Sequence, residues 1–339
     1  MNKLLIIAGP TATGKTNLAL KLACELEGEI VSADSRQVYQ GMDIVTGKDL
    51  PLASKFKSQN SRLGIKTKKF QLGYYLFEKV PVWLLDIVEP DQKFSAADYC
   101  QLAWKVIEDI WQRGKLPIVV GGTGFYIKAL LERIETIGIG PDWKLREELQ
   151  SCTVAELQRI LENVDPERSR RMNESDRQNP RRLIRAVEVA LASQKGEIKN
   201  KKEKLGIQAL DRLIIGLMAP YPLLYQRIDQ RVEERLKKGA EEEIKKLFDK
   251  EYNWGNSVLG STIGYRQWQP YFEAKASKEM VVQKWKYAEH DYARRQMTWF
   301  KKSFRQFGGK WFDISQKAWD QKVEKLVKAW YNLKDAQKD

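Results

Sequence analysis

The feature that most constrains this fold is an eight-residue loop that follows a short apolar run. Residues 4–8 read LLIIA and residues 9–16 read GPTATGKT, which matches the spacing G-x-x-x-x-G-K-[ST]. In such a loop the backbone N–H groups surround a phosphate chain, the lysine neutralises it and the last hydroxyl binds Mg²⁺. The predicted phosphate-binding residues are Gly9, Pro10, Thr11, Ala12, Thr13, Gly14, Lys15 and Thr16, with Thr16 as the metal ligand.

The residues around the loop predict a parallel sheet. Residues 3–9 read as a buried strand, and residues 17–26 carry apolar side chains at helical spacing. Further strands are expected at 29–34, 81–87 and 116–122, with helical sequence between them. We therefore predict an α/β fold, a P-loop NTPase-like doubly wound parallel sheet core with its ligand at the carboxyl ends of the strands.

The middle of the chain interrupts this pattern. Residues 142–204 are charged and helical with no strand signal, and a buried strand returns at 212–221. A sheet that pauses and resumes predicts an inserted helical domain. The predicted organisation is a core at 1–135 and 206–320 that includes the C-terminal helices, a helical insertion domain at 136–205 and a C-terminal tail at 321–339.

Four other segments carry local predictions. Residues 222–248 and 277–307 have helical spacing, whereas the lysine-rich residues 195–206 are expected to form an exposed loop. Residues 52–80 are expected to form a hairpin or flap.

Composition narrows the classes of function. The chain has 339 residues, and 59 Lys and Arg against 45 Asp and Glu leave a net charge of +14, which favours a polyanionic partner such as nucleic acid. Solubility alone is the alternative reading of this charge. Three cysteines without a C-x-x-C and a single histidine argue against a disulfide framework, a zinc cluster or a Ser-His-Asp triad.

No apolar run is long enough to span a membrane, and no signal peptide precedes the loop. We therefore expect a cytoplasmic protein with no membrane partner, and we expect a monomer.

The loop alone leaves two phosphate ligands open, ATP or another diphosphate. An ATPase also needs a magnesium carboxylate at the end of a neighbouring strand, but PIVV at 117–120 is followed by GGTG. Asp86, after VWLL, fits that role or caps a turn. Asp34 ends the strand beside the loop, where it acts as a general base or caps a turn with Ser35.

Several motifs together resemble one family. After GPTATGKT come SADSRQVYQGMDIVTGK at 32–48 and VVGGTGFYIKALL at 119–131. Further matches follow in the same order, namely NPRRLIRAVEV at 179–189, YQRIDQRV at 225–232, STIGYRQ at 261–267 and ARRQMTWFK at 293–301. This series resembles the tRNA dimethylallyltransferase, or tRNA isopentenyltransferase, family of the bacterial type.

The resemblance implies a reaction that hydrolyses no nucleoside triphosphate. The loop is expected to hold the diphosphate of dimethylallyl diphosphate with Mg²⁺, and the dimethylallyl group is expected to pass to N6 of adenosine 37 in the tRNA anticodon loop. By this resemblance Asp34 is the general base and Thr123 lies near the reacting groups. The diphosphate arginine matches Arg227, with Arg231 one turn further on as the alternative.

The resemblance also implies contacts with the anticodon stem-loop. The expected tRNA-binding residues are Asp34, Ser35, Arg36, Gln37, Thr123, Arg146, Arg181, Arg182, Leu183, Ile184, Arg185, Ser261, Thr262, Ile263, Gly264, Tyr265, Arg266, Arg294, Arg295, Gln296, Met297, Thr298, Trp299, Phe300 and Lys301.

Two basic segments fit such a partner. Residues 168–185 hold seven arginines and no lysine, a bias typical of bidentate phosphate contact. Residues 294–311 interleave basic with aromatic side chains, which suits stacking on unpaired bases. For Trp299 and Phe300 the alternative is that the rings face the core.

The chain departs from the family at 82–86, which read VWLLD where members often have His-His-Leu-Ile-Asp, so no role for those histidines is implied here. Two other functions stay open. One is a transferase acting on free adenine nucleotides, for which the basic segments would have no use. The other is a nucleic-acid-dependent ATPase or RNA-binding switch with Asp86 as its magnesium carboxylate.

Overall fold

A computed structural model describes residues 2–51, 54–60, 63, 70–132, 139–194 and 210–332, without the side chain of Arg305. The chain divides into two compact units. The first unit comprises Met1–Phe94, Tyr99–Leu131 and Gln208–Asp339, and the second comprises Ser95–Asp98 and Glu132–Ile207.

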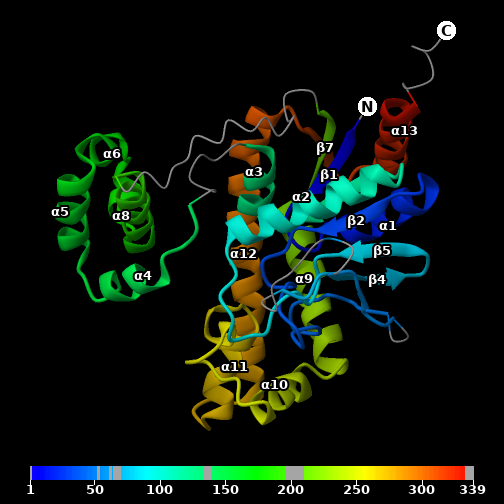
Figure 1. The fold of residues 1–339 in the computed structure, drawn as a ribbon. Coiled ribbons are helices and arrows are strands. Elements are labelled where there is room, and N and C mark those ends of the chain that lie inside the picture. The colour runs from blue at the N-terminus through cyan, green and yellow to red at the C-terminus, as the bar shows by residue number, and fades with distance from the viewer. Residues whose placement is uncertain are drawn as a thin grey trace. The chain divides into compact units, whose positions relative to one another are not determined.

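The first unit is built on a mixed sheet of eight strands in the order β3-β4-β5-β2-β6-β1-β7-β8 (Figure 1). The strands are β1 (Lys3–Ala8), β2 (Glu29–Ser32), β3 (Lys57–Ser58), β4 (Gly73–Phe77), β5 (Val80–Trp83), β6 (Pro117–Gly121), β7 (Asp211–Met218) and β8 (Lys310–Asp313). The pairs from β5 to β8 are parallel, and only β3–β4 and β4–β5 are antiparallel. The predicted α/β class with a mainly parallel sheet is therefore confirmed.

Helices bury both faces of this sheet. On one face Leu5 and Ile7 of β1 join a core cluster with Leu22 of α1 (Lys15–Glu25) and Val323 of α13 (Trp319–Asn332). Side chains alternate along a strand, so Ile6 lies on the opposite face, where it is also fully buried. These two apolar faces explain why the strands read as continuous apolar runs in the sequence.

The long helix α12 (Lys278–Phe307) packs against the opposite face at β7. The rings of Phe304 and Trp311 pack closely over Gly216 of β7. A Cβ at this position would lie only 2.9 Å from a Phe304 ring carbon. The remaining helices of the first unit are α2 (Ala96–Gln112), which belongs to it from Tyr99 onward, α3 (Gly124–Leu131), α9 (Tyr221–Lys237), α10 (Ala240–Asp249), the 3₁₀ turn η3 (Val258–Ser261) and α11 (Tyr265–Phe272).

Two local expectations differ from the structure, and one strand was not expected. The strand expected at 81–87 ends at Trp83, because Leu84 and Asp86 adopt left-handed backbone conformations with φ of 65° and 53°. The helix expected at 222–248 breaks into α9 and α10 at Gly239, whose φ is 96°. Strand β8 was not predicted. The segment 52–80 contains β3, β4 and the first residue of β5, with which β4 forms a hairpin, and the rest of the segment is described only in part.

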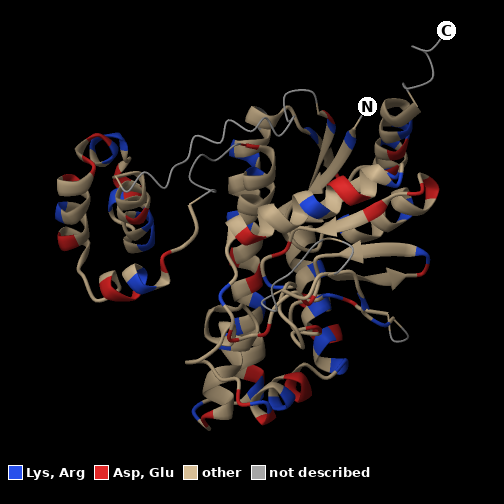
Figure 2. Ribbon diagram, viewed as in Figure 1, with Lys and Arg blue, Asp and Glu red and all other residues tan. Residues whose placement is uncertain are grey.

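The second unit is helical over its described residues. It contains α4 (Trp143–Leu149), α5 (Val154–Val164), α6 (Pro166–Arg171), α7 (Glu174–Arg177) and α8 (Pro180–Gln194). Leu157 and Leu161 of α5 pack against Leu183 and Val187 of α8 in a small core. The colouring of the ribbon in Figure 2 shows that basic and acidic residues are interspersed along these helices. The loop predicted at 195–206 lies outside the described residues.

Across the parts of the chain that the structure describes, none of the helices combines the length and apolarity needed to cross a bilayer.

Candidate active site

The loop at residues 9–16, called the phosphate loop after its sequence motif, links β1 to α1 and is shaped by two glycines. At Gly9 a side chain would collide with the Leu217 carbonyl oxygen of β7, so only glycine lets the chain pass so close. Gly14 is the N-cap of α1 with a left-handed φ of 80°. The loop therefore presents the N-terminus of α1, which favours an anion. Of the eight predicted residues, the structure places Thr11, Ala12, Gly14, Lys15 and Thr16 in the wall of one cavity, with Gly9, Pro10 and Thr13 outside that wall.

Lys15 is held inside the loop. Its Nζ donates to the Pro10 carbonyl oxygen at 2.6 Å. Burial, followed by the charge of Arg231, lowers the pKa of Lys15 to about 7, although Asp34 opposes this shift. Without a ligand, burial makes the charged form of Lys15 unfavourable. An anion that binds beside it would stabilise that charged form.

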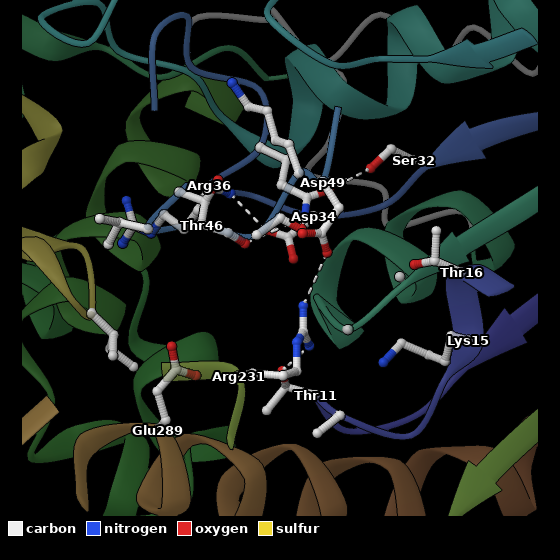
Figure 3. Close-up of a pocket in the computed structure, with 18 of the residues that line it drawn as sticks. Thr11, Lys15, Thr16, Ser32, Asp34, Arg36, Thr46, Asp49, Arg231 and Glu289 are labelled. Carbon is white, nitrogen blue, oxygen red and sulfur yellow. Dashed lines mark hydrogen bonds and ion pairs between the residues drawn. The ribbon is translucent and has the colours of Figure 1, made fainter. Parts of the chain in front are cut away.

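The cavity has a volume of about 670 Å³ and opens over the carboxyl ends of β1, β2 and β6. Figure 3 shows Asp34, Asp49 and Arg231 directed into the same space, with Lys15 and Thr16 on one side. The basic side chains in its wall are Lys15, Arg36, Lys48, Arg227, Arg231, Arg235, Arg266 and Arg295, and the acidic ones are Asp34, Asp49, Glu234 and Glu289. Because the cations outnumber the carboxylates, the cavity fits an anionic ligand.

Both candidate arginines reach the phosphate loop from α9. Arg227 Nη1 donates to the Ala12 carbonyl oxygen at 3.4 Å, and Arg231 Nη1 donates to Thr11 Oγ1 at 3.4 Å. The sequence left these two as alternatives, and the structure brings both to the cavity.

Asp34 follows β2 and is oriented by its own turn. The backbone N–H of Arg36 donates to Asp34 Oδ1 at 2.8 Å. The next residue, Ser35, donates its N–H to Thr123 Oγ1 at 3.0 Å, and the Thr123 N–H donates to the Ala33 carbonyl oxygen at 3.2 Å. Thr123 therefore fixes the turn that carries Asp34, while the second Asp34 oxygen, Oδ2, is free of any hydrogen bond found among the described residues.

Gln296 of α12 was expected to contact RNA, yet its side chain is buried between two loops. Its Oε1 accepts from the Thr11 N–H at 2.9 Å, and its Nε2 donates to the Gly122 carbonyl oxygen at 2.9 Å. The amide thus joins the phosphate loop to the loop after β6. The sequence predicted Gln296 as an RNA contact within the motif ARRQMTWFK, and this linking role was not predicted.

The other expected RNA contacts of the first unit separate by exposure. Those that line the cavity are Asp34, Ser35, Arg36, Gln37, Ser261, Thr262, Ile263, Arg266, Arg295 and Gln296. Those exposed on α12 outside the cavity are Arg294, Thr298 and Lys301. Tyr265, Met297 and Phe300 are buried, so their side chains pack in the protein, and Gly264 precedes α11 with a φ of 92°.

The aromatic residues of 294–311 mainly form core. Phe300 and Phe304 are fully buried and Phe307 is nearly so. Trp299 is half-buried and lies against Gly124, where a Cβ would collide with its ring. The packing interpretation therefore holds for the phenylalanines, and Trp299 keeps part of its ring accessible.

In the second unit the expected contacts lie on α4 and α8. Arg181 and Arg182 are exposed, Leu183 is in the core, and Ile184 packs beside it. Arg146 and Arg185 both bind the buried carboxylate of Glu188, with Arg146 Nε and Nη2 donating at 2.9 and 2.8 Å.

Asp86, the candidate ATPase carboxylate, has both oxygens engaged. Oδ1 forms an ion pair with the buried Lys48, and Oδ2 accepts from the Tyr75 hydroxyl at 2.6 Å. The described residues that line the cavity do not include Asp86. Within the described ranges no cluster of three or more His, Cys, Asp or Glu side chains suits a metal ion.

The sheet and the cavity together define an α/β protein with a cavity suited to an anionic ligand. Two family models match the chain, "IPP transferase" over residues 61–303 and "Isopentenyl transferase" over residues 2–96. The chain belongs to the IPP transferase family of prenyl-transferring enzymes.

Relatives of known name align with nearly the whole chain. The tRNA dimethylallyltransferase of Pediococcus pentosaceus is 37% identical over 99% of both chains, and that of Roseiflexus castenholzii is 39% identical over 89% of this chain and 90% of its own. The crystal structure of the tRNA isopentenylpyrophosphate transferase of Bacillus halodurans aligns with a TM-score of 0.64 at 30% identity, covering 97% of each chain. A eukaryotic dimethylallyltransferase acting on tRNA aligns with a TM-score of 0.72 at 25% identity, covering 96% of this chain and 78% of its own.

Proposed function

We propose that this chain is a tRNA dimethylallyltransferase that transfers the dimethylallyl group of dimethylallyl diphosphate to N6 of adenosine 37 in the anticodon loop, releasing diphosphate. The observation that carries the proposal is the cavity in which Asp34 faces Lys15 of the phosphate loop together with Arg227 and Arg231. The names of the relatives support the same reaction. The β1–loop–α1 unit is proposed to bind the diphosphate as a P-loop binds phosphates.

The leaving group carries most of the chemical burden. The adenine amine is a weak nucleophile because its lone pair is delocalised into the ring, so the diphosphate must depart readily. Lys15, the backbone N–H groups of the loop, Arg227 and Arg231 are proposed to stabilise the charge that develops as the bond from C1 to the diphosphate oxygen breaks. Donors fixed in place around a developing charge supply a large share of catalysis.

Asp34 is proposed to take the proton. As N6 bonds to C1 of the dimethylallyl group, the nitrogen becomes cationic and loses one proton, which the free Oδ2 can accept. The N–H of Arg36 on Oδ1 and the Thr123–Ser35 hydrogen bond hold the carboxylate for this step. A positioned base of this type contributes about 10²- to 10⁴-fold to the rate.

Mg²⁺ is the proposed cofactor, and the residues present fit it. Mg²⁺ commonly binds through one or two protein oxygens, several waters and substrate phosphates. The Thr16 hydroxyl, exposed in the first turn of α1 on the cavity wall, would supply the protein oxygen, and the diphosphate would supply others. When bound, the ion neutralises diphosphate charge.

The anticodon stem-loop is the proposed partner. Arg36, Arg266 and Arg295 line the cavity beside Ser261, and Arg181 and Arg182 are exposed on the second unit. Arginines of this kind bind phosphates in two-point contacts. The target adenosine must leave its stack to reach Asp34, which costs a few kcal/mol. A monomeric state and a cytoplasmic location stay predictions.

The test separates this function from an RNA-dependent ATPase. Purified protein is incubated with unmodified tRNA, Mg²⁺ and labelled dimethylallyl diphosphate without ATP, and the tRNA is digested to nucleosides. We expect label in N6-dimethylallyladenosine, and none with Asp34→Asn. Absence of label together with tRNA-stimulated ATP hydrolysis that Asp86→Asn abolishes would refute the proposal. Label in free adenine nucleotides but not in tRNA would favour the other transferase.

A further inference from the structure

Arg231 lies between the carboxylate of Asp49 and the phosphate loop. Its Nη2 is 3.5 Å from Asp49 Oδ2, and its Nη1 reaches Thr11 Oγ1 at 3.4 Å. Burial and the neighbouring Arg235 lower the pKa of Arg231, and Asp49 is the first of the acidic residues that raise it again. Asp49 therefore supplies negative charge beside the guanidinium group that also reaches the phosphate loop.

The segment from Asp43 to Asp49 is anchored by the buried carboxylate of Glu243. Glu243 of α10 accepts from three successive backbone N–H groups, those of Asp43, Ile44 and Val45, at 2.8, 2.6 and 3.0 Å. It also accepts from the Tyr265 hydroxyl at 2.6 Å. Four donors satisfy this buried anion, so the start of the segment has a fixed position.

The end of the same segment is fitted to the arginines of the cavity. Gly47 has a φ of 66°, and a Cβ there would collide with Arg235 and lie 2.9 Å from Arg231 Nη2. Lys48 is tied down by Asp43 and Asp86. The backbone before Asp49 thus leaves room for Arg231 and aims the carboxylate at it.

Asp49 has a second partner toward solvent. Its side chain is 54% exposed, and Oδ1 lies 3.2 Å from Lys238 Nζ. If the donor's diphosphate draws Arg231 toward the phosphate loop, Asp49 keeps the ion pair with Lys238. The carboxylate can therefore release Arg231 without becoming unpaired.

We propose that Asp49 is a positioning residue that holds Arg231 before the donor binds and competes with the donor's diphosphate for it. The inference rests on the proposed function, because it takes the diphosphate as the anion bound at the phosphate loop. Asp49 repels that diphosphate and forms an ion pair with Arg231, which would otherwise bind it. The wild-type chain therefore binds the donor and the released diphosphate less tightly than a chain without this carboxylate would. Asp49 thus lowers the affinity for the donor and, for the same reason, makes release of the product diphosphate easier.

The test measures a gain of affinity, which a damaged fold cannot produce. Inorganic diphosphate with Mg²⁺ is titrated calorimetrically into the full chain and its Asp49→Asn variant. We expect the Kd to fall by about three- to tenfold in the variant, and the gain to shrink as KCl is raised, because salt screens exposed charges. The KM for dimethylallyl diphosphate is expected to fall in parallel, and the KM for tRNA to stay constant.

Two controls assign the effect to Arg231. Glu242→Gln removes the same charge from an exposed site on α10 and is expected to leave the Kd within about twofold. In an Arg231→Gln background, Asp49→Asn is expected to give a clearly smaller gain, because only the direct repulsion of the diphosphate by Asp49 is then removed. An unchanged or weaker Kd in Asp49→Asn, with transfer by the wild type intact, would overturn this inference alone. A wild type that binds no diphosphate would overturn both this inference and the proposed diphosphate site.

Discussion

The side-chain amide of Gln296 accepts a hydrogen bond from the Thr11 N–H at 2.9 Å and so ties helix α12 to the phosphate loop. The same amide donates to the Gly122 carbonyl oxygen in the loop that precedes Thr123. One buried side chain therefore sets the spacing between the proposed diphosphate site and the turn that orients Asp34.

Replacement of this amide tests its role. Gln296→Ala leaves the Thr11 N–H and the Gly122 carbonyl unpaired in a buried place, so we expect the free energy of unfolding to fall by about 2–4 kcal/mol. We also expect a lower kcat/KM for dimethylallyl diphosphate. Gln306→Ala, at an exposed position of the same helix, is the matched control and is expected to change neither quantity. Equal urea midpoints for the two variants would contradict this role.

Lys15 predicts a pH dependence of donor binding. Burial and Arg231 lower the pKa of Lys15 to about 7, so the free enzyme holds the cation below that pH and loses it above. A bound diphosphate favours the protonated form, so affinity should fall by about tenfold per pH unit as the pH rises from about 7 to 9.

The comparison that isolates this lysine is Lys15→Arg, because arginine stays charged throughout that range. Titration of the donor itself affects both proteins alike, so the ratio of their Kd values reports Lys15. We expect the wild type to lose affinity relative to Lys15→Arg above pH 7. A constant ratio between pH 6 and 9 would show that Lys15 does not change its charge there.

Glu188 organises the second unit. Burial disfavours its charged form, but hydrogen bonds from Arg146, Arg185 and the Asp142 N–H outweigh burial and lower its pKa. A carboxylate whose pKa is lowered in the folded state adds stability at pH values above its unfolded pKa. This contribution is lost as the pH falls through the lowered value. Glu188→Gln should therefore destabilise the unit at neutral pH by about 3 kcal/mol and have much less effect in acid.

Hydrogen exchange of amides in α4 and α8 measures that effect locally. We expect faster exchange in Glu188→Gln, and no change in Glu148→Gln, which alters an exposed carboxylate of α4. Because Arg146 and Arg185 lose their common anchor, tRNA affinity should also fall. Unchanged protection of α8 would contradict a structural role for Glu188.

The strands of the central sheet were predictable, and its edges were not. β1, β6 and β7 are buried on both faces, which leaves continuous apolar runs that any reader of the sequence can find. The edge strand β8 has half-buried and exposed residues, so no apolar run marks it. The early end of β5 depends on the left-handed conformations of Leu84 and Asp86, which residue type does not reveal.

Part of the candidate site follows from local spacing. The phosphate loop lies within eight residues, and Asp34 comes directly after a predicted strand. The partners that complete the cavity come from distant positions. Glu243 bonds the backbone of Asp43 across 200 residues, and Gln296 bonds Thr11 across 285. Pairings over such separations arise only when the helices pack on the sheet, so local patterns carry no signal of them.

The most direct test of the account is a single-turnover comparison of the wild type with Asp34→Asn. Enzyme in excess is mixed with an unmodified anticodon stem-loop, Mg²⁺ and labelled dimethylallyl diphosphate, and the Kd values for RNA and diphosphate are measured in parallel. We predict a transfer rate lowered by about 10²- to 10⁴-fold with both Kd values nearly unchanged, because Asp34 takes a proton and binds neither substrate tightly. Transfer by Asp34→Asn at the wild-type rate would contradict the proposed role of Asp34.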